Sequence, residues 1–430
     1  MLWQRLMLRP RSTKATHNNG MLSFHKKTVY EALGREPVHP FPARMAPGIA
    51  LQVMSESDSA VRVLDPMMGS GTVLAMARSK GHKGIGFDID PLAVLISRVW
   101  TTALDIQEAR EQSQEVLCRA RTAFKSLSHG DAYPEKCDEE TRQFVSYWFD
   151  GYARRQLSAL STAIEAVKCE STRDVLWCAF SRLIISKQSG ASLAMDLSHS
   201  RPHRTFERAP EKPFRKFVSA VERVLTNSVD KRSPNRGPAP SLRIGDARDL
   251  PLNDGSVDLV LTSPPYLNAI DYIRCSKFSL VWMGYSIADL RSLRTNSVGS
   301  EASNESTLDD VEIAEIVKML KLTPRLDSRH EGILARYVGD MRSAVSEVGR
   351  VLARGGKAVY VIGENSLRGT YIRTSTIVTK LAELVGLELA ERLTRTLPSN
   401  RRYMPPPASG YCGGNIEARM RRELVLTFVK

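Results

Sequence analysis

The sequence predicts an α/β fold in which one largely parallel sheet is interrupted by a mostly helical insertion. Residues 61–90 indicate a strand, a glycine-containing turn, a helix and a second strand that ends in acidic residues. Residues 258–266 indicate a short buried strand that stops at two successive prolines, because proline cannot donate to a sheet. Between these stretches, residues 101–240 place apolar residues three and four apart, which is the period of a helix. We therefore expect residues 38–100 and 241–430 to build the sheet together.

Composition and charge narrow the class of protein. The chain has 430 residues, of which 42% are hydrophobic and 25% charged, as is typical of a globular protein with one large domain or two ordinary ones. No apolar run is long enough to span a bilayer as a helix. Lysine and arginine total 61 against 47 acids, so the formal charge of +14 favours a polyanionic partner, nucleic acid before an anionic membrane surface. The 6 cysteines show no paired spacing, so we expect neither a metal site nor disulfides and infer a reducing compartment.

The first segment, residues 1–37, is basic. No acid precedes Glu31, whereas arginine and lysine recur throughout the segment. Three interpretations remain open: a basic arm that lies along a phosphate backbone, a start placed too early ahead of Met21, and an organellar transit peptide. The transit peptide is the least favoured of the three, because the segment lacks a clear amphipathic period.

The turn after the first strand is a candidate binding site. It spans residues 65–72 and contains two glycines, and the second strand ends at Asp88. This order of elements is the nucleoside-binding half of a Rossmann-like sheet, in which the terminal acid binds ribose hydroxyls. A dinucleotide would favour a third glycine where Leu74 stands, and the carboxylate of Asp65 repels phosphate but suits a cationic amino group. S-adenosylmethionine has an ammonium group, a ribose and no phosphate, so it is favoured over a dinucleotide.

Two further strand ends carry polar residues. Asp246 follows a strand at residues 242–245 and is placed to accept a hydrogen bond from an adenine amino group. At the proline-bound strand end, the Ser263 hydroxyl and the Pro264 carbonyl are acceptors in fixed positions, and Tyr266 adds a flat face. Together these groups suit a planar ring that carries an exocyclic amine. The alternative is that the prolines simply end a strand, and the neighbouring nucleoside motif favours the functional interpretation.

With both motifs in place, the chain resembles the S-adenosylmethionine-dependent DNA amino-methyltransferases, the DNA methylase N-4/N-6 family. The run Asp65-Pro-Met-Met-Gly-Ser-Gly-Thr72 looks like that family's cofactor motif, and Thr262-Ser-Pro-Pro-Tyr266 looks like its catalytic motif. Residues 39–47 are similar to an extra cofactor-side motif. The run from Thr262 to Arg274 resembles cytosine-N4 enzymes, because adenine enzymes more often carry Asp or Asn where Ser263 stands. These matches cover roughly half of the chain.

The resemblance implies a Rossmann-like class I methyltransferase sheet and assigns roles to individual residues. The catalytic residues that it implies are Ser263, Pro264, Pro265 and Tyr266. The cofactor-binding residues that it implies are Phe41, Ala43, Arg44, Met45, Asp65, Pro66, Met67, Gly69, Ser70, Gly71, Thr72, Asp88, Ile89, Asp246, Ala247 and Thr262.

The implied activity is site-specific methyl transfer to the exocyclic N4 of cytosine in double-stranded DNA, with the base flipped out of the helix. Such an enzyme is expected in the cytoplasm of a prokaryote, at the nucleoid, in restriction-modification or a related defence. A separately encoded restriction or defence protein is a further candidate partner, and the oligomeric state stays open. An adenine-N6 DNA methyltransferase is the first alternative. An RNA methyltransferase and a non-catalytic DNA-binding relative are less favoured.

The segments outside these motifs are expected to recognise the target sequence. These are the helical insertion, residues 101–240, and a second, polar and partly flexible insertion at residues 286–334. Two basic loops are expected to contact DNA phosphates, through His199, Arg201, His203, Arg204, Arg401 and Arg402. A zinc site at His199 and His203 lacks a nearby third ligand. Residues 423–430 are expected to close the sheet as an edge strand.

Overall fold

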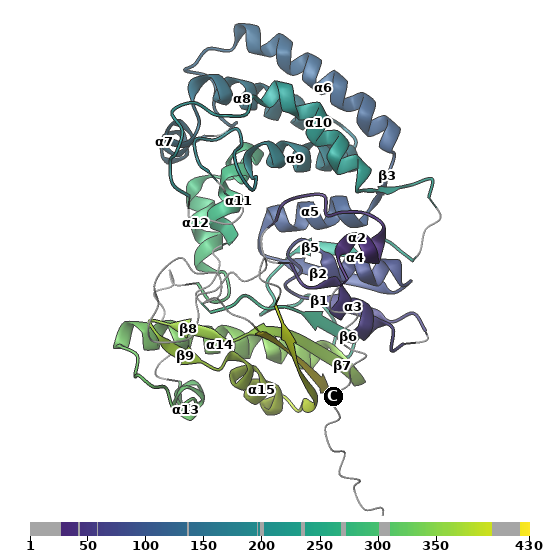
Figure 1. The fold of residues 1–430 in the computed structure, drawn as a ribbon, viewed down its shortest axis with the longest axis vertical. Coiled ribbons are helices and arrows are strands. Elements are labelled where there is room, and N and C mark those ends of the chain that lie inside the picture. The colour runs from purple at the N-terminus through teal and green to yellow at the C-terminus, as the bar shows by residue number, and fades with distance from the viewer. Residues whose placement is uncertain are drawn as a thin grey trace, which may run out of the picture.

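The computed structural model describes residues 27–41, 44–57, 59–135, 137–195, 197, 202–233, 237–267, 272–300, 310–397 and 422–430. A 7-stranded, mostly parallel sheet lies at its centre, so the predicted α/β fold is confirmed (Figure 1). The strand order is β10-β11-β7-β6-β1-β2-β5. The strands span Arg62–Asp65 (β1), Lys83–Asp88 (β2), Ser241–Ile244 (β5), Val257–Thr262 (β6), Leu352–Gly363 (β7), Glu388–Thr396 (β10) and Arg422–Val429 (β11).

The last strand does not lie at the edge of the sheet. β11 pairs antiparallel with β7 on one side and with β10 on the other, so the prediction of an edge strand there is wrong. Leu424, Leu426 and Phe428 face one side of the sheet and Val425 faces the other, which is the two-sided apolar pattern of an inner strand. β10 takes the edge instead, and its exposed, charged side chains are typical of edge strands.

Helices cover both faces of the sheet. α13 (Val311–Met319), α14 (Ser328–Val351) and α15 (Thr374–Leu384) pack on one face, against residues such as Val260 and Tyr360. α3 (Pro47–Met54) and α4 (Thr72–Ser79) pack on the other, against their strand neighbours Leu261 and Val361. Because successive strand residues point to opposite faces, a near-continuous apolar run such as β6 fills both cores at once. A short α2 (Val29–Leu33) and a β8–β9 hairpin (Asn365–Leu367 and Thr370–Ile372) complete this half.

The chain order creates a crevice at the carboxyl ends of the parallel strands. From β1 the chain moves outward through β2 to β5, and it then returns to the other side of β1 as β6. In an open α/β sheet, the loops on either side of such a reversal diverge and leave room for a ligand. The loops that follow β1 and β6 are the two that carry the predicted motifs.

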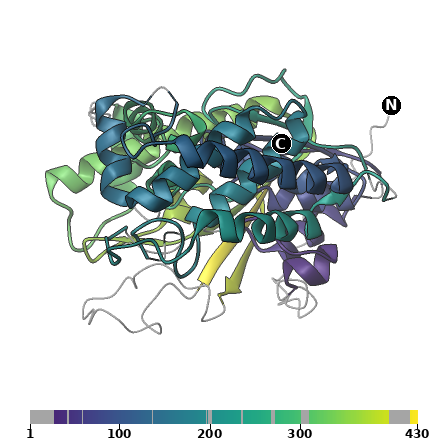
Figure 2. The same cartoon turned by 90° about the horizontal axis from the view of Figure 1, so that it is seen from above.

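A helical layer lies over the sheet (Figure 1; Figure 2 shows it from above). Several of its helices begin at aspartate N-caps, among them Asp105, Asp138 and Asp150, whose side chains accept from free backbone N–H groups of the first turn. Two short strands, residues 103–104 and residues 229–230, pair in parallel at the base of this layer. The elements are α5 (Pro91–Thr101), β3 (Ala103–Leu104), α6 (Ile106–Ser126), α7 (Glu139–Trp148), α8 (Gly151–Glu165), α9 (Glu170–Ile184), α10 (Pro213–Thr226) and β4 (Val229–Asp230).

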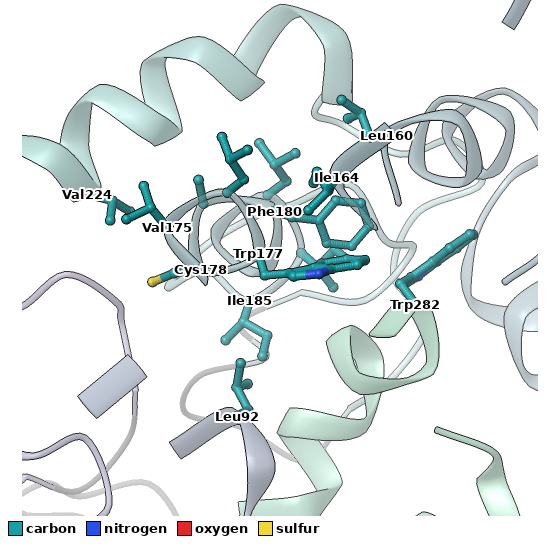
Figure 3. Packing of buried hydrophobic residues seen from close by; sticks show 14 of the residues in the cluster. Leu92, Leu160, Ile164, Val175, Trp177, Cys178, Phe180, Ile185, Val224 and Trp282 are labelled. Atoms are coloured by element: carbon teal, nitrogen blue, oxygen red, sulfur yellow. The ribbon is translucent and has the colours of Figure 1, made fainter. Parts of the chain in front are cut away.

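A later segment joins this layer as well. α11 (Tyr272–Leu280), the 3₁₀ helix η1 (Val281–Met283) and α12 (Ile287–Thr295) share its hydrophobic core. In Figure 3, Trp282 of η1 lies beside the aromatic side chains of α9, and Leu92 of α5 points toward Ile185. The second predicted insertion, residues 286–334, is therefore divided. α12 packs with the helical layer and α13 with the sheet, while α14 begins inside the predicted range at Ser328.

Candidate active site

Both predicted motifs open into one cavity of about 1120 Å³. Gly69, in the loop after β1, and Tyr266, in the loop after β6, line it together. Gly71 and Thr262 lie outside its lining, and Ala43 falls outside the described residues. The predicted residues that line it are Phe41, Arg44, Met45, Asp65, Pro66, Met67, Gly69, Ser70, Thr72, Asp88, Ile89, Asp246, Ala247, Ser263, Pro264, Pro265 and Tyr266.

The loop after β1 depends on a glycine at position 71. Gly71 has a φ of 80°, in the left-handed region, and it caps the first turn of α4. A Cβ at this position would lie 2.7 Å from the hydroxyl oxygen of Ser97. That hydroxyl donates to the Gly69 carbonyl at 2.8 Å, so the loop and α5 are held in direct contact. Both the backbone conformation and the close approach therefore require glycine.

Three carboxylates converge beside this loop. Asp65 accepts from the Thr262 hydroxyl at 2.8 Å, which links the carboxyl ends of β1 and β6. Asp88 accepts from the backbone N–H of Gly69 at 2.8 Å. Asp90 accepts from the backbone N–H of Leu92, so it also caps α5. Among the described residues, hydroxyl groups and backbone N–H groups donate to these three carboxylates.

Burial governs the charge of these acids. Desolvation raises the pKa of Asp65 to about 7 and that of Asp90 to about 7, and it also raises the pKa of Asp88. The charge of Asp88 raises the pKa of each neighbour further. A cation in the cavity would stabilise the ionised carboxylates, so the cluster suits a positively charged ligand. The predicted set omitted Asp90, although its position in the Asp88-Ile-Asp90 strand end is a signal that was open to sequence reasoning.

Asp246 lines the cavity in an ion pair. Arg248 donates to both of its carboxylate oxygens, at 3.0 and 2.7 Å, and also reaches Asp340 at 2.5 Å and the carbonyl of Asn296 at 2.6 Å. Asn296 and Gly299 belong to a segment after α12 that also lines the cavity. The backbone N–H of Arg248 also donates to Asp246, at 2.9 Å, so three donor groups occupy its about four acceptor positions and about one remains for an amino group.

Residues distant in sequence hold the loop after β6. The hydroxyl of Tyr337, on α14, donates to the Pro265 carbonyl at 3.3 Å. The hydroxyl of Tyr266 donates to Glu423 at 3.0 Å, and Arg395 donates to the other oxygen of Glu423 at 2.8 Å. Burial and the nearby Glu423 charge raise the pKa of Tyr266 well above its usual value, so the phenol stays protonated. None of the three supporting residues stands near a motif, so no local sequence pattern identifies them.

A basic rim faces the sheet from the helical layer. It comprises Arg182, Lys187, Arg223, Arg274 and Arg294, which line the cavity from α9, α10, α11 and α12 or just beyond them. Lys187, Arg223 and Arg294 are exposed. Positive charge at the mouth of a cavity attracts polyanions such as a nucleic acid backbone.

The predicted DNA-contacting residues lie elsewhere. His203 and Arg204 are exposed but do not line the cavity, and Arg204 lies over the Tyr147 ring with its guanidinium carbon 5.4 Å from the ring centroid. His199, Arg201, Arg401 and Arg402 fall outside the described residues. In the described part of the chain no group of three or more metal-ligating side chains occurs, and no helix is long and apolar enough to cross a membrane.

Comparison with known proteins identifies distant relatives over most of the chain. The chain is 21% identical to the Type II methyltransferase M.MvaI of Kocuria varians, and the match covers 96% of this chain and 95% of that protein. It is 22% identical to the Type II methyltransferase M.BsoBI of Geobacillus stearothermophilus, over 85% of this chain and 82% of that protein. A solved SAM-dependent methyltransferase from Methanosarcina mazei is 9% identical, with a TM-score of 0.32 over 88% of this chain and 96% of its own. No protein-family model matches. The two curated relatives support the predicted methyltransferase activity, while the base that is modified stays a prediction.

Proposed function

We propose that this chain transfers a methyl group from S-adenosylmethionine to an exocyclic amino group of a base in double-stranded DNA, with N4 of cytosine as the first candidate. The observation that carries the proposal is the single cavity shared by the Gly69 loop and the Ser263-Pro264-Pro265-Tyr266 loop. Its volume of about 1120 Å³ exceeds the range of roughly 300–1,000 Å³ that is usual for one small ligand. A cavity of this size accommodates a cofactor and a target base together.

The acidic cluster supports a sulfonium cofactor. Asp65, Asp88 and Asp90 present negative charge and hydrogen-bond acceptors beside the Gly69 loop. In the proposed complex, Asp88 binds the ribose hydroxyls, Asp246 accepts from the adenine amino group, and the cluster offsets the positive charges of the ligand. Phe41, whose ring stacks on Tyr272 with centroids 5.8 Å apart, adds an aromatic wall.

When bound, the cofactor supplies an electrophilic methyl group on a sulfonium centre. The chain's own residues make the amine reactive. An exocyclic amine conjugated to a ring is a poor nucleophile, so the Ser263 hydroxyl and the Pro264 carbonyl accept its two N–H hydrogens and favour a pyramidal nitrogen. The lone pair then faces the methyl carbon, and alignment at about 3–3.5 Å provides most of the acceleration. The same acceptors stabilise the positive charge that develops on nitrogen, and the surplus proton passes to water.

Because the amine lies inside a duplex, the target base must leave the helix to enter the cavity. We assign the stacking face to Tyr266 and the flanking phosphate contacts to the basic rim, with the helical layer as the target-recognition unit. The relatives named above carry the description Type II, so we further propose a role in restriction-modification.

The test is direct. The full-length protein is incubated with labelled S-adenosylmethionine and, in separate reactions, with unmethylated DNA or with RNA, and each nucleic acid is digested to nucleosides that are identified by mass. N4-methyldeoxycytidine is the expected product. N6-methyldeoxyadenosine would move the activity to adenine, while labelling of RNA alone, or of neither, would overturn the proposal. Ser263→Ala serves as the matched variant that keeps the cofactor loop intact.

A further inference from the structure

We infer that Glu423, held by Arg395, positions the ring of Tyr266 for the methyl transfer, so that two residues of the last two strands serve as positioning residues for the site. The inference rests on the proposed function. It adds Arg395 and Glu423 to the site, which lie 129 and 157 positions after Tyr266 in the sequence. Neither residue belongs to a motif of the sequence.

The three side chains form one chain of contacts. The Tyr266 hydroxyl donates to one carboxylate oxygen of Glu423 at 3.0 Å, and the Arg395 guanidinium donates to the other at 2.8 Å. Arg395 and Glu423 stand directly opposite each other in the register of β10 and β11. All three residues line the cavity that receives both motif loops. The position of the Tyr266 ring is therefore tied to the sheet, not only to its own loop.

The burial of the ion pair is unusual for its place in the fold. The Arg395 and Glu423 side chains are 6% and 14% exposed, although β10 is the edge strand and most of its residues are exposed. Removing both charges from water costs free energy, and two apolar residues would serve the sheet at least as well. What they would not provide is an acceptor for the Tyr266 hydroxyl. A charged acceptor binds a hydroxyl about twice as strongly as a neutral one.

The loop is held at a second point. Tyr337 donates to the carbonyl of Pro265, the residue that precedes Tyr266 in the chain. With its backbone held from α14 and its hydroxyl held from β11, the Tyr266 ring has little freedom to rotate. A fixed ring defines the plane in which an extruded base stacks, and this plane sets the direction of the amine. A displacement of about 1 Å at a reacting group can cost on the order of 100-fold in rate.

Methyl transfer to unmethylated DNA by full-length variants tests the inference. Tyr266→Phe keeps the ring and removes the donor, and Arg395→Leu combined with Glu423→Leu removes the acceptor without leaving an unpaired buried charge. We expect each to lower kcat about tenfold, which corresponds to one charge-assisted hydrogen bond, with unchanged binding of S-adenosylmethionine. All three substitutions together should be no worse than the pair alone, because they remove the same contact. Glu423→Gln, which keeps an acceptor, should retain more activity than the Leu pair.

Tyr360→Phe is the matched control. Tyr360 is buried on the neighbouring strand β7, and its hydroxyl has no hydrogen-bond partner among the described residues, so its loss should leave kcat within about twofold. If the wild type is active and Tyr266→Phe has the same kcat, the inference is overturned. It is also overturned if the losses in kcat multiply in the triple variant. A wild type that transfers no methyl group overturns the proposed function instead. Tyr266→Phe keeps the test decisive if the Leu pair fails to fold.

Discussion

Binding of S-adenosylmethionine should strengthen as the pH rises from 5.5 to 7.0. Asp65 and Asp90 line the cavity, and burial raises the pKa of each to about 7. At pH 5.5 both carboxyls of the free protein are mostly protonated, and a cationic ligand must displace those protons. The ammonium group of the ligand keeps its charge over this range, because an α-amino group has a pKa of about 7.7–8.0.

The size of the effect follows from the raised pKa values. If one carboxyl with a pKa of 7 must ionise, the dissociation constant at pH 5.5 exceeds that at pH 7.0 by about 15-fold. The effect is larger if Asp65 and Asp90 both ionise. Stability of the free protein has the opposite sign. An acid whose pKa is raised from 3.8 to about 7 by folding holds more protons in the folded state, so the free energy of unfolding falls as the pH rises through that window. At pH 7, Asp65 alone lowers the free energy of unfolding by up to about 4 kcal/mol relative to acidic pH.

Asp65→Asn separates the two effects. Asparagine keeps an oxygen that accepts from the Thr262 hydroxyl and from the backbone N–H of Met67, so the loop after β1 should retain its shape. Titration calorimetry at four pH values should show weaker binding at pH 7 and a shallower pH dependence. Urea unfolding of the ligand-free variant at pH 7 should show higher stability than the wild type. Asp254→Asn, whose side chain is 80% exposed, is the matched control and should change neither measurement.

Two results would refute this reasoning. One is a dissociation constant that does not change between pH 5.5 and 7.0 in the wild type. The other is a ligand-free Asp65→Asn protein that unfolds more readily than the wild type at pH 7, because the carboxylate would then stabilise the empty site.

The remaining predictions concern the two loops and the rim. Ser263→Ala should lower turnover far more than cofactor affinity, and Asp88→Ala should do the reverse, as measured by kcat and by calorimetry; equal losses in both variants would count against the assigned roles. Gly71→Ala should destabilise the fold by about 2–5 kcal/mol in urea unfolding, because a left-handed φ and the overlap with the α5 helix both oppose a Cβ. Gly81→Ala has a similar φ of 83° but open space, so it should cost only about 1–2 kcal/mol, and equal losses would remove the steric argument. Arg223→Gln should reduce the slope of log K against log salt for DNA binding by about 1, and an unchanged slope would place the DNA elsewhere.

The sequence predicts the meeting of the two loops because each loop is a local pattern. A strand that ends in glycines or prolines is recognisable within ten residues, and the carboxyl ends of parallel strands lie at one edge of the sheet. Gly69 and Tyr266 therefore reach one cavity although 197 positions separate the β1 and β6 partners Asp65 and Thr262.

Contacts made by the tertiary fold left no such signal. Glu423 is one of two acids in the basic segment 395–430 and belongs to no recognisable pattern, and only the antiparallel insertion of β11 beside β7 brings it to Tyr266. The placement of α11 and α12 in the helical layer depends on apolar packing, and apolar spacing predicts a helix without naming its neighbours. The raised pKa of Asp65 depends on burial, which strand periodicity indicates only coarsely.

The shared core constrains how a base reaches the cofactor. Helix α5 contacts β2 and β5 of the sheet, and its Leu92 and Trp100 belong to the same hydrophobic cluster as Trp177 and Trp282 in the rest of the helical layer. At the cavity, Asp90 caps α5 and also accepts from the Ser276 hydroxyl on α11. Close-packed interiors do not deform continuously, so the helical layer cannot swing on the sheet without breaking this core. The distance between the basic rim and the cofactor loop is therefore fixed by the protein, and the base must cover it by rotating out of the DNA.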